Sequence, residues 1–176
     1  MANLTLPRRI LAAIIIALAV VAANPAADAR TVKGEKSFGP GIGYVSRINS
    51  ATGALAFTYS LSSVVRVAPE IGIIFRNRNL DGLNACVNVH FPVGAAGSRF
   101  AFYPLVGVNF TSWGLHNVDS ESGVDVTTHR NLFGLNAGAG VELRCSGALK
   151  LSLEARYTLM RHYPTAFVTA GIAFVF

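Results

Sequence analysis

The sequence contains few charged residues, and it has only one long apolar run. Charged residues make up 14% of the 176 positions and hydrophobic residues 52%, whereas soluble domains carry roughly 25% charge. The apolar run, Ile10–Ala23, has 14 residues, and a helix that spans a bilayer needs about 20. The composition indicates a membrane protein or a poorly solvated surface, but it offers no transmembrane helix.

The N-terminal segment has the three parts of a secretory signal peptide. Arg8 and Arg9 precede the apolar run, and Ala27-Asp28-Ala29 follows it as a small-x-small cleavage pattern. This order predicts a cleaved signal peptide over residues 1–29 and a mature domain over residues 30–176. A retained membrane anchor is the alternative, and the shortness of the run argues against it.

The mature chain alternates apolar with polar or small residues at a period of two, which is the pattern of β-strands. In Ala148–Leu159, Leu149 and every second residue after it share one face, while Lys150, Ser152, Glu154, Arg156 and Thr158 share the other. Ala54–Ser62 and Val64–Phe75 alternate in the same way. We expect strands near residues 37–47, 54–62, 64–76, 83–92, 99–112, 131–144, 148–159 and 165–176.

These segments are close to the 9–11 residues, approximately, that a tilted strand needs to cross a bilayer. Pro40, Pro69 and Pro104 fall inside three of them and are expected to mark bulges, because proline cannot donate to a strand ladder. The predicted fold class is all-β: an eight-stranded antiparallel up-and-down transmembrane β-barrel after a cleaved signal peptide. A closed barrel leaves no unpaired backbone edge in the bilayer.

The two faces of the expected strands differ in chemistry. Ten of the 11 phenylalanines fall on the apolar face, and Phe167 is the exception. The opposite face is rich in small residues and carries the mid-strand charges, namely Arg66, Glu70, Glu142, Lys150, Glu154 and Arg156. A soluble barrel would direct charges outward. Small residues mixed with paired charges suit the narrow lumen of an eight-stranded barrel, so we expect the apolar face to meet lipid.

The connections between strands support a barrel with two different ends. Cys145-Ser146-Gly147 is expected to be a three-residue hairpin loop that pairs Leu143 with Leu149 and Glu142 with Lys150. Short connections (62–64, 93–98, 145–147) alternate with others expected to be longer (48–53, 77–82, 113–130, 160–164). Both termini would then lie in the periplasm. We expect no disulfide between Cys145, in a periplasmic turn, and Cys86, within a strand.

The last expected strand, Thr165–Phe176, ends on an aromatic residue, with Phe174 and Ile172 on the same face. With its short mature length, the chain resembles the OmpA/OmpX-like, "porin family" group of small outer-membrane β-barrels. The resemblance covers essentially the whole mature chain, including Val65–Glu70 and Tyr103–Gly107. It implies a location in the outer membrane of a Gram-negative bacterium. It also implies that Phe176, Phe174 and Ile172 form the signal that the barrel assembly machinery recognises, after periplasmic chaperones deliver the chain.

The sequence holds no convincing catalytic or metal-binding set. His90 is expected on the lumen side near Asn84 and Asn88, and no Ser/His/acid triad stands out. Asp119, Glu121, Gly123 and Asp125 lack EF-hand spacing. The net charge of +6 forms no basic patch along the sequence, so nucleic acid is not expected as a partner. We predict no enzyme activity, no metal and no cofactor.

Two classes of function compete. In the first, internal ion pairs close the lumen, and the barrel has a structural or surface-interaction role, with loop 113–130 contacting an extracellular partner. In the second, the lumen is a narrow passive pore for small solutes or ions. A lipid-modifying outer-membrane enzyme is a third, more distant alternative. We favour the closed lumen because eight strands leave an interior that side chains nearly fill.

Overall fold

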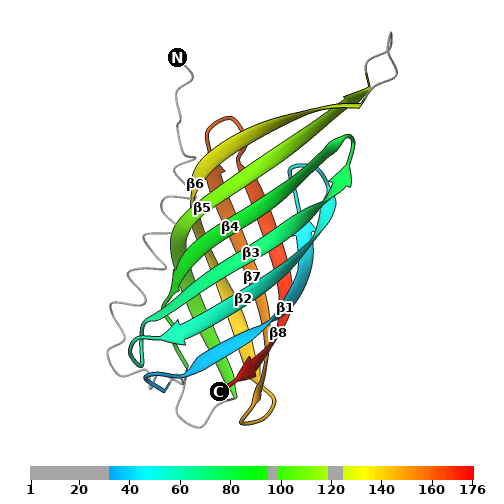
Figure 1. The fold of residues 1–176 in the computed structure, drawn as a ribbon. Coiled ribbons are helices and arrows are strands. Elements are labelled where there is room, and N and C mark those ends of the chain that lie inside the picture. The colour runs from blue at the N-terminus through cyan, green and yellow to red at the C-terminus, as the bar shows by residue number, and fades with distance from the viewer. Residues whose placement is uncertain (1–31, 95–98, 119–124) are drawn as a thin grey trace.

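The computed structural model describes residues 32–94, 99–118 and 125–176, and these form one closed antiparallel barrel (Figure 1). The predicted signal peptide and Asp119, Glu121 and Gly123 lie outside the described residues. The strands are β1 (Lys36–Val45), β2 (Ser50–Ser60), β3 (Arg66–Asn77), β4 (Leu80–His90), β5 (Phe100–Val118), β6 (Asp125–Arg144), β7 (Leu149–Met160) and β8 (Thr165–Val175). The eight-stranded all-β prediction is confirmed. Within the described ranges, no helix is long and apolar enough to cross a membrane.

The barrel has two distinct ends. At the terminal end, β1 starts and β8 finishes, and Phe176 exchanges backbone hydrogen bonds with Lys36. The β2–β3, β4–β5 and β6–β7 connections lie at this end, near the C-terminus in Figure 1. The distal end carries the other connections. The β5–β6 hairpin projects there beyond all the other strands (Figure 1).

Side chains alternate between the inside and the outside of the barrel as the period-two pattern predicts. In β7, Lys150, Glu154 and Arg156 are buried inside, whereas Leu151 and Leu153 are exposed outside. Phe167, the one phenylalanine expected off the apolar face, is 1% exposed. Many large aliphatic and aromatic side chains are exposed on the outside of the barrel, so the outer surface is strongly apolar.

The distal connections differ from those expected. Residues 113–118 and 125–130, predicted as loop, continue β5 and β6. The expected longer connections 48–53 and 77–82 are tight turns instead. Arg78 and Asn79 alone join β3 to β4, with φ of 50° and 62°, the left-handed pair of a type I′ hairpin turn. The strand end 125–130 consists mostly of polar residues, so the hydrophobic pattern did not reveal it.

The predicted β6–β7 register is wrong by two residues. Leu143 pairs with Leu151, and Glu142 pairs with Ser152. The turn lies one residue later than expected, because the Cys145 amide donates to the Leu149 carbonyl. A shift of two keeps every side chain on its expected face, which explains why the alternation could not reveal the error.

The three prolines do not mark bulges. The β1–β8 ladder lacks pairs at Pro40, and the β2–β3 ladder lacks them at Pro69, but the register is the same on both sides of each gap. Pro104 pairs with Ala139 in an uninterrupted ladder. Among the described strands, the register shift lies instead between Ile74 and Asn77, in the β3–β4 pair.

Candidate functional site: the lumen and the distal end

The interior side chains form three layers along the barrel axis. A layer of ion pairs occupies the terminal end and the middle, amide and hydroxyl groups follow, and an apolar cluster fills the distal end. Together these layers decide whether the lumen can conduct.

The first ion pairs lie near the terminal end. Arg66 from β3 contacts Glu142 from β6 at 2.7 Å, and Lys150 from β7 lies 3.9 Å from the same carboxylate. Lys150 also contacts Glu35 at 3.0 Å, and Arg144 contacts Glu35 at 2.6 Å. These contacts connect the segment before β1 with β3, β6 and β7 across the barrel mouth.

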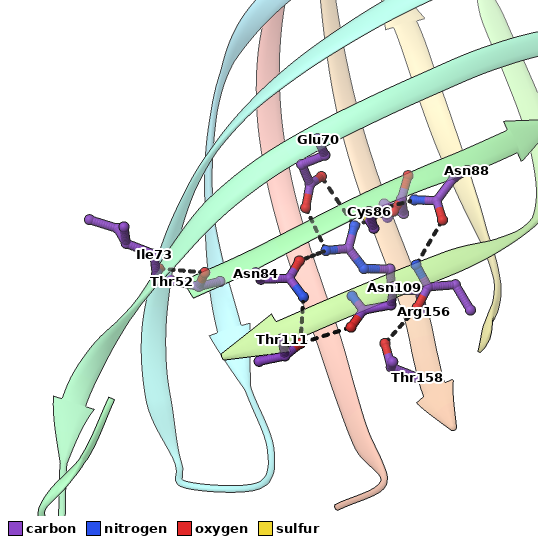
Figure 2. Close-up of polar contacts among 12 residues, drawn as sticks. Thr52, Glu70, Ile73, Asn84, Cys86, Asn88, Asn109, Thr111, Arg156 and Thr158 are labelled. Carbon is purple, nitrogen blue, oxygen red and sulfur yellow. Dashed lines mark hydrogen bonds and ion pairs between the residues drawn. The ribbon is translucent and has the colours of Figure 1, made fainter. Parts of the chain in front are cut away.

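Arg156 forms the second group of ion pairs in the middle of the barrel. Its guanidinium meets both oxygens of Glu70, at 2.5 and 3.1 Å, and lies 3.1 Å from Glu154. Figure 2 shows Arg156 between Glu70 and Asn84, whose amide oxygen accepts a further hydrogen bond at 3.5 Å. The guanidinium also lies over the Phe167 ring, 4.9 Å from its centroid.

Glu35 is a lumen charge that was not predicted from the sequence. Its side chain is 7% exposed although it precedes the first strand. The period-two alternation could have revealed it. Counted back in steps of two, Glu35 shares the inward face of Ser37, Gly39 and Gly41. With Glu35 and Arg144 included, four acids (Glu35, Glu70, Glu142, Glu154) face four bases (Arg66, Arg144, Lys150, Arg156) in connected contacts.

His90 and Tyr103 bridge the two groups of ion pairs. Their rings stack with centroids 4.6 Å apart. The His90 Nδ1 lies 3.2 Å from Arg66, and the Tyr103 hydroxyl donates to Glu154 at 3.3 Å. Tyr103 lies over its register partner Gly140, where an added Cβ would approach the ring to 2.3 Å. The sequence placed His90 in the lumen but gave no reason to choose Tyr103.

The second layer consists of neutral hydrogen-bonding groups. Asn84 donates to Thr111, which donates to Asn109. On the other side, Thr158 donates to Asn136, which donates to Asn88 (Figure 2). All the residues in these two series of hydrogen bonds are buried. This layer lies beside the Arg156 ion pairs, which also reach the apolar cluster at Phe167, and it ties β4, β5, β6 and β7 together.

The third layer is an apolar plug at the distal end of the lumen. It is formed by Val45, Ile48, Ile74, Trp113, Met160 and Phe167, each at most 4% exposed, with Leu80, Leu132 and Tyr163 packed against it. The sequence pointed only to Phe167. The plug matters because an apolar constriction resists wetting, and an ion that crossed it would lose its hydration.

A small cavity remains between the ion pairs and the opposite wall. Its volume is about 80 Å³, and Arg66, Glu142 and Lys150 line one side. Gly39, Gly41, Ala54, Ala56 and Gly171 line the other side. The space is large enough for a few water molecules. It lies on the terminal side of the amide layer and the plug.

Exposed bases gather around the distal end. Arg47, Arg78, Arg130, Arg161 and His162 are exposed in the distal turns or in the projecting part of β6. Among the side chains that the structure describes there, Asp81 is the acid, and its carboxylate is 2.9 Å from His116. These bases come from three turns and one strand that are distant in sequence, so no sequence pattern showed that they share one end of the barrel.

The remaining candidate residues lie outside the lumen, with the exception of Cys86. Ile172, Phe174 and Phe176 are 47%, 58% and 69% exposed at the terminal end. Cys145 is exposed in the β6–β7 turn, and Cys86 is buried inside the barrel. Within the described ranges, no three His, Cys, Asp or Glu side chains are grouped so that they could hold a metal ion.

The comparisons with solved structures agree on the fold. No family model and no curated protein matches the sequence. The N-terminal barrel domain of OprF from Pseudomonas aeruginosa superposes with a TM-score of 0.62 at 15% identity, over 82% of this chain and 98% of that one. Neisserial surface protein A gives 0.65 at 12% identity, with coverages of 82% and 98%. Ail of Yersinia pestis, the attachment invasion locus protein, gives 0.59 at 14% identity, with coverages of 82% and 100%. The chain therefore has the fold of the small eight-stranded outer-membrane β-barrels.

Proposed function

We propose that the mature protein is a non-enzymatic outer-membrane barrel with a closed lumen, whose distal end contacts a partner outside the cell. The observation that carries the proposal is the stacking of three different layers inside the barrel. A continuous water path would have to pass paired charges, then bonded amides, then an apolar plug. Opening it would require breaking contacts in all three layers.

The outer surface supports a location in the outer membrane. Ile42, Leu83, Val108 and Leu135 are between 55% and 74% exposed, and in water such side chains would stay uncovered at a high cost in free energy. A signal peptide over residues 1–29 would deliver the chain to the periplasm. The terminal end would then face the periplasm and the distal end the outside.

Assembly into the outer membrane would use the C-terminal residues. Phe176, Phe174 and Ile172 lie on the outside of the last strand, where they are accessible before β8 closes against β1. We propose that the barrel assembly machinery binds this aromatic face and that periplasmic chaperones protect the unfolded chain beforehand. Once the barrel has closed, the same residues would lie in lipid.

The distal end is the proposed surface for a partner. It combines a projecting hairpin with exposed bases, and barrel scaffolds commonly present binding segments in this way. Ail, one of the barrels with this fold, has been solved in complex with the heparin analogue sucrose octasulfate. That complex is a property of Ail, and for this chain it supports only the general idea of a surface that binds.

The alternative is a narrow passive pore, favoured by the cavity and by the charges that line it. Planar-bilayer recordings of the purified full chain separate the two functions. We expect no stable unitary currents. Currents that change when Glu154→Gln or Arg156→Gln is introduced would establish the pore and exclude the closed lumen.

The surface role is tested by partner capture on intact cells. Trimming residues 117–126 is expected to abolish capture while the barrel still reaches the membrane. Unchanged capture after trimming would exclude the tip of the hairpin as the contact surface.

A further inference from the structure

The projecting part of β6 has one paired edge and one open edge. On one side, β6 pairs with β5 along its whole length, from Phe100↔Leu143 to Val118↔Asp125. On the other side, its ladder with β7 starts only at Gly134↔Met160. Residues 125–133 of β6 therefore lie beside no further strand, and Figure 1 shows this hairpin extending past its neighbours.

The register decides which backbone groups face the open edge. The Cys145 amide donates toward β7, to Leu149, and the Arg144 amide donates toward β5, to Arg99. Because strand residues alternate in this direction and the β5–β6 register is unbroken, odd-numbered residues of β6 face the β7 side. Thr127, His129, Asn131 and Phe133 therefore direct both N–H and C=O groups at the open edge.

This edge lacks most of the features by which proteins usually protect exposed strands. Such edges commonly carry charged side chains, proline or a bulge, or another segment covers them. Here Arg130 is an exposed charged residue. Residues 125–133 contain neither proline nor lysine, and their pairing with β5 has no register shift. The side chains of Thr127, Thr128 and Asn131 are exposed. An extended chain could add to the edge by backbone hydrogen bonds.

The charges beside the edge define the partner. A strand added here would continue the line of β7 beyond Met160, where Arg161 and His162 are exposed. Arg130 is exposed on β6 itself, and Asp81 is engaged with His116 on the opposite side of β5. We propose that the open edge of β6 binds an extended, acidic polypeptide segment of a partner protein as an additional strand. This inference rests on the proposed surface role and names the chemistry of its partner.

The first test measures amide hydrogen exchange in the full chain in detergent, with and without a synthetic peptide of about eight alternating threonine and glutamate residues. Without peptide, the amides of Thr127, His129 and Asn131 should exchange faster than those of Thr128 and Arg130, which face β5. The peptide should slow the exchange of the odd-numbered amides and leave the even-numbered ones unchanged. Equal protection of both sets would contradict strand addition.

The second test compares Asn131→Pro with Asn131→Ala. Both variants lose the amide side chain, but only proline removes the edge N–H, and proline is tolerated on an edge that faces solvent. Asn131→Pro should weaken peptide binding about tenfold. The variant loses one backbone hydrogen bond to the peptide, and the adjacent hydrogen bond is distorted. Asn131→Ala should bind as the natural sequence does. Equal binding by the two variants would overturn the proposal.

The charge requirement is tested with the same peptide pattern built from threonine and lysine, and with Arg161→Gln. Both changes should weaken binding. If sucrose octasulfate displaces the acidic peptide while the odd-numbered amides stay unprotected, the distal bases bind polyanions and the strand proposal is wrong. That result would leave the closed lumen and the surface role intact, because bilayer recordings and partner capture measure those separately.

Discussion

Arg156 and Glu70 face each other across the barrel, from β7 to β3, and each of the two terminal guanidinium nitrogens meets one carboxylate oxygen. The pair is bidentate, and the Arg156 side chain is 2% exposed. Its geometry holds two strands that are distant in the sheet order at a fixed separation. The pair is therefore a sensitive point for the stability of the whole barrel.

Arg156→Gln should lower the free energy of unfolding by about 3–5 kcal/mol, because it leaves the carboxylates of Glu70 and Glu154, whose side chains are 12% and 11% exposed, without their cation. Urea unfolding in lipid vesicles measures this loss. The double variant Arg156→Gln with Glu70→Gln should lose less than the sum of the two single changes. Additive losses would show that the two side chains do not interact, and Lys36→Gln, at an exposed position, serves as the neutral control.

Leu151 and its neighbour Ser152 test the assignment of the two faces. Leu151 is exposed outside, whereas Ser152 lines the cavity opposite Glu142. Leu151→Lys should destabilise the barrel in vesicles by about 2–4 kcal/mol if it lies near the bilayer middle. Ser152→Lys should cost less, because its ammonium can meet the Glu142 carboxylate. Equal losses would show that the outer face does not contact lipid.

Phe167 and Phe174 lie on the same strand and point in opposite directions. Phe167 belongs to the apolar plug and is 1% exposed, and Phe174 is 58% exposed. Phe167→Ala should lower the free energy of unfolding by about 3–5 kcal/mol, because it opens a hole in the plug. Phe174→Ala serves as the matched control and should cost much less. Comparable losses would argue that the plug is not closely packed.

Deletion of Phe176 should impair assembly more than deletion of residues 119–124. The physical reason is that Phe176 pairs with Lys36 at the point where the barrel closes, and it belongs to the proposed assembly signal. Heat-modifiable mobility on gels and membrane fractionation give the folded and the inserted fraction. Recovery of the natural chain from the soluble periplasm without detergent would contradict the membrane location itself.

The alternation of the sequence was enough to predict the barrel and the inward direction of Arg66, Glu142 and Arg156. A period of two assigns each residue to a face without any knowledge of its partner. It cannot determine which residues meet across strands, so the β6–β7 register was two residues wrong. The contact between Glu35 and Lys150 also depends on closure of the barrel, which no local pattern reports.

The plug and the projecting hairpin escaped prediction for related reasons. Val45, Ile74 and Met160 are apolar residues on the inner face at strand ends. The rule that apolar residues face outward therefore assigns them to the wrong face. Apart from Val126, the segment 125–131 is polar, so hydrophobic alternation disappears although the ladder with β5 continues. Pairing with a neighbouring strand makes this segment a strand.

The ladder between β1 and β8 differs from all the others in the barrel, because every other ladder joins strands that are consecutive in the sequence. Hairpins can form locally and early, whereas Ser37 and Val175 must find each other across nearly the whole domain. Closure of this seam therefore requires all the intervening hairpins to be in place. Until then β1 and β8 would each present an unsatisfied edge, which a lipid environment penalises heavily. The final step of folding should consequently be all-or-none. Barrels in which β1 and β8 are only partly paired should be short-lived and readily degraded.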